Sequence, residues 1–174
     1  TVSRMVMNLL DVSGGHALAV RRSACSVGAL FRHLRDHFAP RLELREVTLA
    51  TRADALELWA DAELLRRVAE NLVDNALRYA PPRSHVDVAV ETAADGRYLI
   101  VTDRGPGVPP EHRERVFDRF VQLDPDASRR ASRGLGLAFC RLALEAHAGR
   151  IWVDEPAGGG ARFCARFPDP AGPC

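Results

Sequence analysis

The sequence contains no lysine, so all 24 of its basic residues are arginines, against 23 aspartates and glutamates. The resulting net charge of +1 gives no sign of the basic surface that nucleic-acid binding requires, and we expect no nucleic-acid partner. No apolar run approaches the roughly 20 residues of a membrane-spanning helix, and no signal peptide is visible, so we expect no membrane contact.

Cysteines are few and widely spaced. They lie at positions 25, 140, 164 and 174, without the short spacings of metal ligands. We interpret them as reduced thiols of a cytoplasmic protein. A length of 174 residues suits one domain with a single core.

Residues 66–80 combine a helical apolar pattern with a polar edge. Asn71 and Asn75 are four residues apart, and at about 100° per residue they share one helix edge with Arg78. The neighbouring apolar stripe consists of Val68, Leu72, Ala76 and Tyr79. Amide oxygens suit a hard cation that keeps waters and phosphate oxygens as its other ligands, so the pattern predicts one wall of a metal-nucleotide site. A surface helix with two ordinary polar residues is the alternative.

The strand expected over residues 98–101 is followed by Asp103, Gly105 and Gly107. Glycines at these positions permit positive φ and close backbone approach. A carboxylate at a strand end beside such a turn can accept a hydrogen bond from an exocyclic amine. An Asx turn that closes a hairpin is the alternative.

Gly134 and Gly136 precede an amphipathic helical run. Glycines before a helix N-terminus leave backbone N–H groups available to phosphate, although a lone Gly-x-Gly also suits an ordinary helix start. Upstream, Phe117 and Phe120 precede a long polar stretch. We interpret that stretch as a mobile loop held at one end by the two phenylalanines, with simple core packing of the rings as the alternative.

The motifs follow one another as an asparagine helix, an Asp-x-Gly-x-Gly strand end, a Phe-x-x-Phe segment, a polar loop and a Gly-x-Gly helix start. This order resembles the N, G1, F and G2 boxes of the GHKL ATP-binding fold, and specifically the catalytic domain of sensor histidine kinases. The resemblance covers roughly residues 20–168 and implies ATP and Mg²⁺ as cofactors. The expected fold is a two-layer α/β sandwich, with a mixed, mostly antiparallel sheet and helices packed on one face.

The resemblance also implies a role for each matched position. Asn75 matches the Mg²⁺-binding asparagine, with Asn71 near the metal and phosphates, and Asp103 matches the carboxylate that accepts from the adenine amino group. Arg78 and Tyr79 match a basic and aromatic pair that touches phosphate and ribose. The other implied ATP-binding positions, in the adenine pocket, the lid anchor and the triphosphate loop, are Gly105, Gly107, Val108, Phe117, Phe120, Arg133, Gly134, Leu135, Gly136 and Leu137. The implied catalytic residues are Asn71, Asn75 and Arg78.

Two positions depart from the family pattern. Ser132 replaces a frequent third glycine, and Gln122 stands where many histidine kinases have an arginine. A cation for the γ-phosphate must then come from elsewhere, and the unranked candidates are Arg119, Arg129, Arg130 and Arg133. A non-catalytic nucleotide-binding module is the corresponding alternative.

Asn71 separates the subfamilies of this fold. Its ATPases and serine kinases carry a glutamate at this position as a general base, whereas an amide cannot take a proton. A neutral histidine acceptor is already nucleophilic, so we expect phosphoryl transfer to histidine. A GHKL-type ATPase or an anti-sigma-like serine kinase is the alternative.

The patterns also predict where helices and strands lie. Helices are expected over residues 1–12, 26–38, 61–80 and 134–147, with Ser26 and Asp61 as N-caps and Pro40 ending the second. Strands are expected over residues 17–21, 47–51, 56–60, 85–91, 97–102, 150–154 and 161–167. We expect strands 47–51 and 56–60 to pair with each other, and strands 85–91 and 97–102 to form a hairpin.

We divide the chain into four parts. Residues 1–13 are expected to be the truncated end of a dimerisation-domain helix, 14–25 a linker with the first strand, 26–168 the ATP-binding catalytic domain and 169–174 a tail. The phosphoacceptor motif of the family is absent, and we interpret all six histidines as structural or solvated.

The resemblance implies partners for such a fragment. They are a histidine-containing dimerisation domain, on the same parent chain or on a split-kinase partner, and a downstream response regulator. We expect the isolated domain to be monomeric and cytoplasmic, within a parent protein that can be anchored in the inner membrane, and not to autophosphorylate alone.

Overall fold

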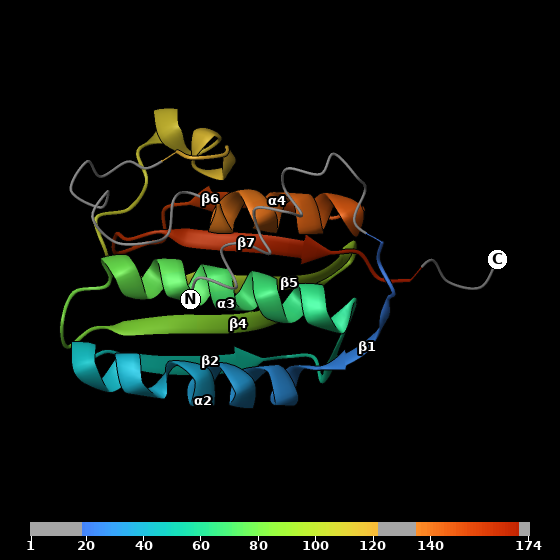
Figure 1. Ribbon diagram of the computed structural model, residues 1–174, viewed down its shortest axis with the longest axis horizontal. Helices are drawn as coiled ribbons and strands as arrows, with labels where there is room; N and C mark the ends of the chain where they lie inside the picture. Colours follow the sequence, from blue (N-terminus) through green and yellow to red (C-terminus); the bar gives the residue numbers. More distant parts are fainter. Residues whose placement is uncertain (1–18, 122–134, 171–174) are drawn as a thin grey trace.

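The computed structural model describes residues 19–121 and 135–170. These residues form two layers, in which three α-helices cover one face of a five-stranded sheet (Figure 1). None of the described helices is long and apolar enough to cross a bilayer. The predicted sandwich with helices on one face is confirmed.

The sheet has the strand order β2-β4-β5-β7-β6. Its strands are β2 (Thr48–Ala53), β4 (His85–Ala93), β5 (Gly96–Thr102), β6 (Arg150–Asp154) and β7 (Arg162–Phe167). Only the β2–β4 pair is parallel, so the sheet is mixed and mostly antiparallel, as predicted. One cross-strand row of buried residues joins Val88, Val101, Phe163 and Val153, and it lies beneath the helices.

The first strand and its pairing differ from the prediction. β1 (Ser23–Ser26) lies after residues 17–21, and it pairs antiparallel with β3 (Glu57–Ala60) in a separate two-stranded sheet. Between β2 and β3, the Asp54 carboxylate accepts hydrogen bonds from the backbone N–H and the hydroxyl of Thr92, which holds this turn against β4. The prediction that both segments are strands is confirmed. The prediction that β2 and β3 pair with each other was wrong.

The helix α2 (Val27–Arg45) continues past Pro40, so the predicted end at Phe38 was wrong. Ser26 caps its start as predicted, because its hydroxyl accepts from the N–H of Ala29 at 3.3 Å. The helix ends at Arg45, and its C-cap Glu46 has a left-handed φ of 53° and donates its N–H to the Leu42 and Glu43 carbonyls. Pro40 lies on the exposed side of the helix, where a missing backbone donor is tolerated.

Helices α3 (Ala62–Tyr79) and α4 (Gly136–Ala146) carry the predicted asparagine and glycine motifs. Asp61 caps α3, since its Oδ1 accepts from the N–H groups of Glu63 and Leu64, both at 3.1 Å. His147, directly after α4, donates from Nδ1 to the Ala143 carbonyl at 2.6 Å and accepts at Nε2 from the Asp61 N–H at 2.9 Å. One neutral imidazole thus joins the end of α4 to the start of α3.

This arrangement predicts a loss of stability in acid. Burial lowers the pKa of His147, so the folded chain resists a proton that the unfolded chain accepts below about pH 6.5. Stability contributed by neutral His147 is present above that pH and falls as the pH drops through this range. We expect the free energy of unfolding in urea to fall less between pH 7.5 and 5.5 in His147→Gln than in the wild type. Equal decreases in the two proteins would contradict this role for His147.

Candidate functional site

The C-terminal end of α3 and the loop after β5 meet at Gly105. A methyl group at Gly105 would lie 2.8 Å from the Tyr79 carbonyl oxygen and 3.0 Å from Asp103 Oδ1, so only glycine fits there. Asn75 lies one turn before Tyr79 in the same helix. The asparagine helix and the Asp-x-Gly-x-Gly loop, separate in sequence, are therefore in direct contact.

Asp103 is a buried carboxylate, 2% exposed, held by backbone donors. Its Oδ1 accepts from the N–H of Gly105 at 2.8 Å and from the N–H of Ala161 at 3.3 Å. Burial raises the pKa of Asp103, and these two N–H groups act against that rise. Both hydrogen bonds end on Oδ1, so Oδ2 is the atom placed to accept from a ligand.

The glycine turn before β7 forms the second support of Asp103, and the sequence patterns did not single it out. A methyl group at Gly160 would lie 2.1 Å from the Asp103 carbonyl oxygen, and one at Gly107 would lie 2.9 Å from the Gly160 oxygen. Ala161, predicted to begin the last strand, lies before β7, which begins at Arg162. Its carbonyl accepts from the Asp103 N–H, and its own N–H donates to the Asp103 carboxylate. The run Gly158–Gly160, between the predicted strands 150–154 and 161–167, was the available signal.

We expect Gly160→Ala to destabilise the fold strongly. Gly160 has a φ of 95°, which is strained for alanine, and the added methyl group would also strike the Asp103 carbonyl. The strain alone costs about 1–3 kcal/mol, and the contact adds to it. Gly159→Ala is the matched control, because its φ is 83° and no atom of the described residues outside its chain neighbours lies within 4 Å of the added methyl group. Urea unfolding should show a larger decrease in the free energy of unfolding for Gly160→Ala than for Gly159→Ala. Equal decreases would contradict a role for the contact with the Asp103 carbonyl.

Gly136, the first residue of α4, lies against the middle of α3. A methyl group at Gly136 would be 3.0 Å from Asn71 Oδ1. The Asn71 Nδ2 atom is buried and has no hydrogen-bond partner among the described residues. Leu135, the N-cap of α4, makes no side-chain cap bond, so among the described residues no side chain caps the N–H groups at this end of the helix. An orphaned amide donor and uncapped N–H groups together suit an anionic ligand.

Of the two phenylalanines, only Phe117 packs as expected. It closes the short helix η2 (Arg115–Phe117) after η1 (Pro110–His112), with its ring edge-to-face on Phe163 at 6.2 Å and Arg141 over it at 5.2 Å. Phe120 is 62% exposed and has a φ of 64°, so its ring does not pack as that of Phe117 does, and its predicted role as a lid anchor stays a prediction.

The other predicted positions fall into three groups. Val108 and Leu137 are half-buried and pack against the core, while Leu135 is buried. Arg78 pairs with Asp74 at 3.5 Å, and its carbonyl accepts from Arg45 of α2, so its predicted phosphate contact stays a prediction. Positions outside the described residues are Gln122, Arg129, Arg130, Ser132, Arg133 and Gly134.

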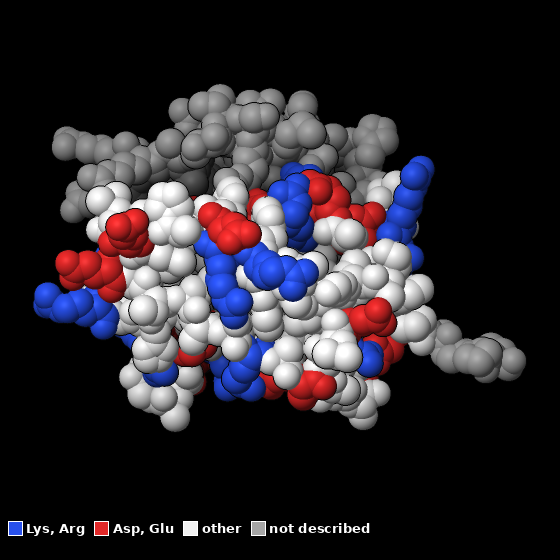
Figure 2. Space-filling model, turned by 90° about the horizontal axis from the view of Figure 1, so that it is seen from below, with Lys and Arg blue, Asp and Glu red and all other residues white. Residues whose placement is uncertain are grey.

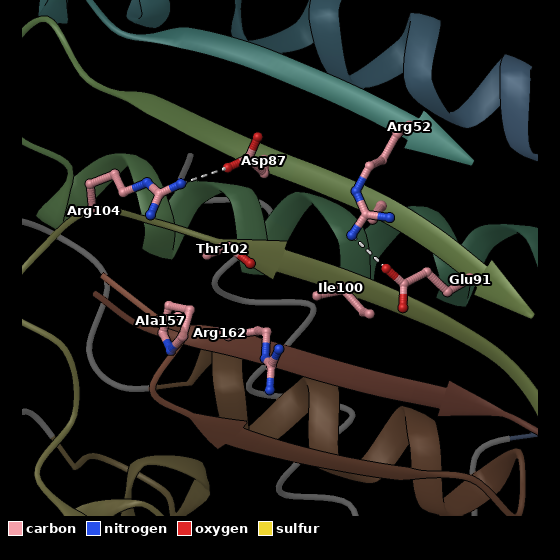
Figure 3. Close-up of a pocket in the computed structure, with 10 residues that line it drawn as sticks. Arg52, Asp87, Glu91, Ile100, Thr102, Arg104, Ala157 and Arg162 are labelled. Carbon is pink, nitrogen blue, oxygen red and sulfur yellow. Dashed lines mark hydrogen bonds and ion pairs between the residues drawn. The ribbon is translucent and has the colours of Figure 1, made fainter. Parts of the chain in front are cut away.

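A hollow of about 310 Å³ lies elsewhere, on the sheet face away from the helices (Figure 3). The arginines that line it are paired: Arg52 with Glu91, Arg104 with Asp87 and Arg162 with Asp154. Arginines and carboxylates are also interspersed on the side shown in Figure 2. Exposed pairs of this kind contribute little each, and we assign no ligand to this hollow.

The comparison with known proteins identifies the family. Residues 60–171 match the model of the histidine kinase-, DNA gyrase B-, and HSP90-like ATPases, which is more than half of the chain. The chain belongs to this family. The predicted resemblance to sensor histidine kinases is confirmed by its similarity to the sensor protein IrlS of Burkholderia pseudomallei, 35% identical over 173 residues.

Within this ATPase family, the similarity to other kinases extends over nearly the whole chain. The adaptive-response sensory kinase SasA of Trichormus variabilis is 31% identical over 97% of the chain. A crystal structure of full-length ShkA with AMPPNP superposes with a TM-score of 0.82 at 27% identity over 99% of the chain. The chain spans only 36% of IrlS, 43% of SasA and 37% of ShkA.

Proposed function

We propose that this chain is the ATP-binding catalytic domain of a sensor histidine kinase, which transfers the γ-phosphoryl group of ATP to a histidine on a dimerisation domain. The observation that carries the proposal is that two glycine motifs contact the asparagine-bearing half of α3, one at its middle and one at its C-terminal end. Asp103 meets Tyr79 through Gly105, and Asn71 meets the start of α4 at Gly136. The matches to sensor kinases support the same reading.

Asp103 would recognise adenine. Its Oδ1 is already committed to two backbone N–H groups, so Oδ2 would accept from the exocyclic amine. This carboxylate selects a base that carries a hydrogen-bond donor opposite Oδ2. A base with an acceptor there would leave both that acceptor and Oδ2 buried without a hydrogen bond. Gly105, Gly107 and Gly160 let the backbone close around it.

The polar edge of α3 and the start of α4 would hold the triphosphate. The orphaned Asn71 Nδ2 and the uncapped N–H groups of α4 are donors for phosphate oxygens. The carboxamide oxygen of Asn75, one turn on, fits Mg²⁺, which takes oxygen ligands and keeps several waters. Magnesium bound with the nucleotide would neutralise charge that develops on the transferred group.

Asn71 favours histidine over water or serine as acceptor. The position that would need a base carries an amide, and the neighbouring carboxylate of Glu70 is bound by His33 and Arg66 on the α2 side. The carboxylate directly before Asn75, that of Asp74, pairs with Arg41 and with Arg78. A histidine acceptor needs no such base near neutral pH.

The remaining parts of the assembly follow from the same proposal. Residues 1–13 would be the end of a dimerisation-domain helix and 169–174 a tail, and neither the former nor residues 171–174 lie within the described ranges. A response regulator would take the phosphoryl group from the dimerisation domain. An ATP-using domain of this kind would work as a monomeric unit on the cytoplasmic side of the membrane.

The test uses γ-labelled ATP, Mg²⁺, this chain and a histidine-bearing dimerisation domain from a sensor kinase. We expect acid-labile, base-stable label on the added domain and none on this chain alone. Acid-stable label on serine, or release of phosphate without the added domain, would establish a serine kinase or an ATPase instead. ATP binding without label transfer would establish a non-catalytic nucleotide-binding module.

A further inference from the structure

His33, His37 and Glu70 lie together between α2 and α3, outside the nucleotide site. Each offers one ligand atom, and these atoms all lie within 4.8 Å of one another. The two histidines are four residues apart on α2, so their rings share a face and stack at 5.6 Å. His33 Nε2 is 2.7 Å from Glu70 Oε1, which comes from α3.

Glu70 is held by charge as well as by His33. The carboxylate is 2% exposed, and Arg66 Nη1 lies 2.8 Å from the same Oε1 atom. Arg66 also pairs with Glu63 through Nε and Nη2, so its guanidinium keeps a carboxylate partner if Glu70 turns toward a cation. A buried carboxylate needs compensating charge, and a divalent ion supplies it.

The donor set selects the class of ion. Two imidazole nitrogens and one carboxylate oxygen suit Zn²⁺, Co²⁺, Ni²⁺ and Cu²⁺, whereas Mg²⁺ and Ca²⁺ prefer oxygen ligands. His37 is exposed and His33 is half-buried, so an ion can enter from solvent. We propose that His33, His37 and Glu70 bind a divalent transition-metal ion of the zinc class, which joins α2 to α3.

Such an ion would bind next to a residue of the proposed nucleotide site. Glu70 directly precedes Asn71, so a metal on Glu70 fixes the turn of α3 that carries the orphaned amide. The site is separate from the proposed magnesium position at Asn75, because Glu70 and Asn75 face different sides of α3 at about 100° per residue. It does not depend on the proposed function.

The test titrates ZnCl₂ into the full chain without nucleotide, in a non-chelating buffer, by calorimetry. We expect one binding event that persists in excess MgCl₂. His37→Gln and His33→Gln should each lower the affinity for zinc by at least about tenfold. Even the loss of a residue that only supports a metal ligand lowers metal affinity by that factor. His85→Gln is the matched control, because His85 is a partly exposed histidine beside Asp87 on β4 and should leave zinc binding unchanged.

His33→Gln keeps a donor for Glu70, and His37 is exposed, so both variants should fold, which circular dichroism verifies. In addition, Cu²⁺ should broaden the amide signals around residues 33, 37 and 70 before others in a nuclear magnetic resonance spectrum. The proposal is overturned if the two variants bind zinc as the wild type does. It is also overturned if the wild type binds no zinc, or if broadening begins elsewhere.

Discussion

Asp103→Ala should lower the affinity for ATP by roughly 5- to 150-fold, which corresponds to about 1–3 kcal/mol. The adenine amine would lose its acceptor in a buried place, and the N–H groups of Gly105 and Ala161 would lose theirs. Calorimetric titration with a non-hydrolysable ATP analogue measures the change. Asp87→Ala is the matched control, because Asp87 is a partly exposed carboxylate on the outer face of the sheet.

Acid should act on the wild type in the same direction as this substitution. Since burial raises the pKa of Asp103, the carboxyl takes up a proton at a higher pH than an ordinary aspartate. The acceptor is then lost, and ATP affinity should fall on acidification while Asp103→Ala changes less. An Asp103→Ala protein with wild-type affinity, or with the same pH profile as the wild type, would rule out the adenine contact.

Asn75→Ala should lower phosphoryl transfer to an added dimerisation domain by about a hundredfold or more. The carboxamide oxygen that would hold the magnesium-bound triphosphate is gone, whereas the adenine contacts at Asp103 remain. We therefore expect nucleotide binding measured in EDTA to change little and the gain in affinity on adding Mg²⁺ to disappear. Label transfer at several Mg²⁺ concentrations separates the two effects.

The control for Asn75→Ala is Glu63→Gln, a change in the first turn of the same helix whose side chain is 61% exposed. It should transfer label at the wild-type rate. Retained transfer in Asn75→Ala would remove the metal role of this residue. A parallel loss of binding in EDTA would show instead that Asn75 supports the fold of the site.

Local patterns predicted those features of the fold that depend on neighbouring residues. The β4–β5 hairpin followed from two alternating runs around a short turn, and the cap at Asp61 followed from its place before an apolar stripe. Which strands pair with each other was harder to predict from the sequence. The alternation in β2 showed which residues face the core. Each residue of β2, however, pairs with a residue of β4 that lies 37 positions farther along the chain, and no local signal marks that partner.

The same distinction applies to the candidate site. The sequence indicated Asp103, Asn71 and the glycines of the two loops, because their side-chain chemistry is local. It did not indicate Gly160 or Ala161, which act through backbone atoms and reach Asp103 only because β5 pairs with β7. It also predicted that Phe120 packs like Phe117, since the spacing of the rings carries no information about the positive φ at Phe120.

The hydrogen bond from Ala161 to Asp103 spans 58 residues of chain. During synthesis, the ribosome therefore releases the aspartate long before the segment that completes its surroundings. A nascent chain that stops before this segment would carry the recognition carboxylate with only one of its two backbone donors. Nucleotide would then be captured late in translation, once the final hairpin has added to the sheet, and ATP would act as a ligand that marks a finished domain.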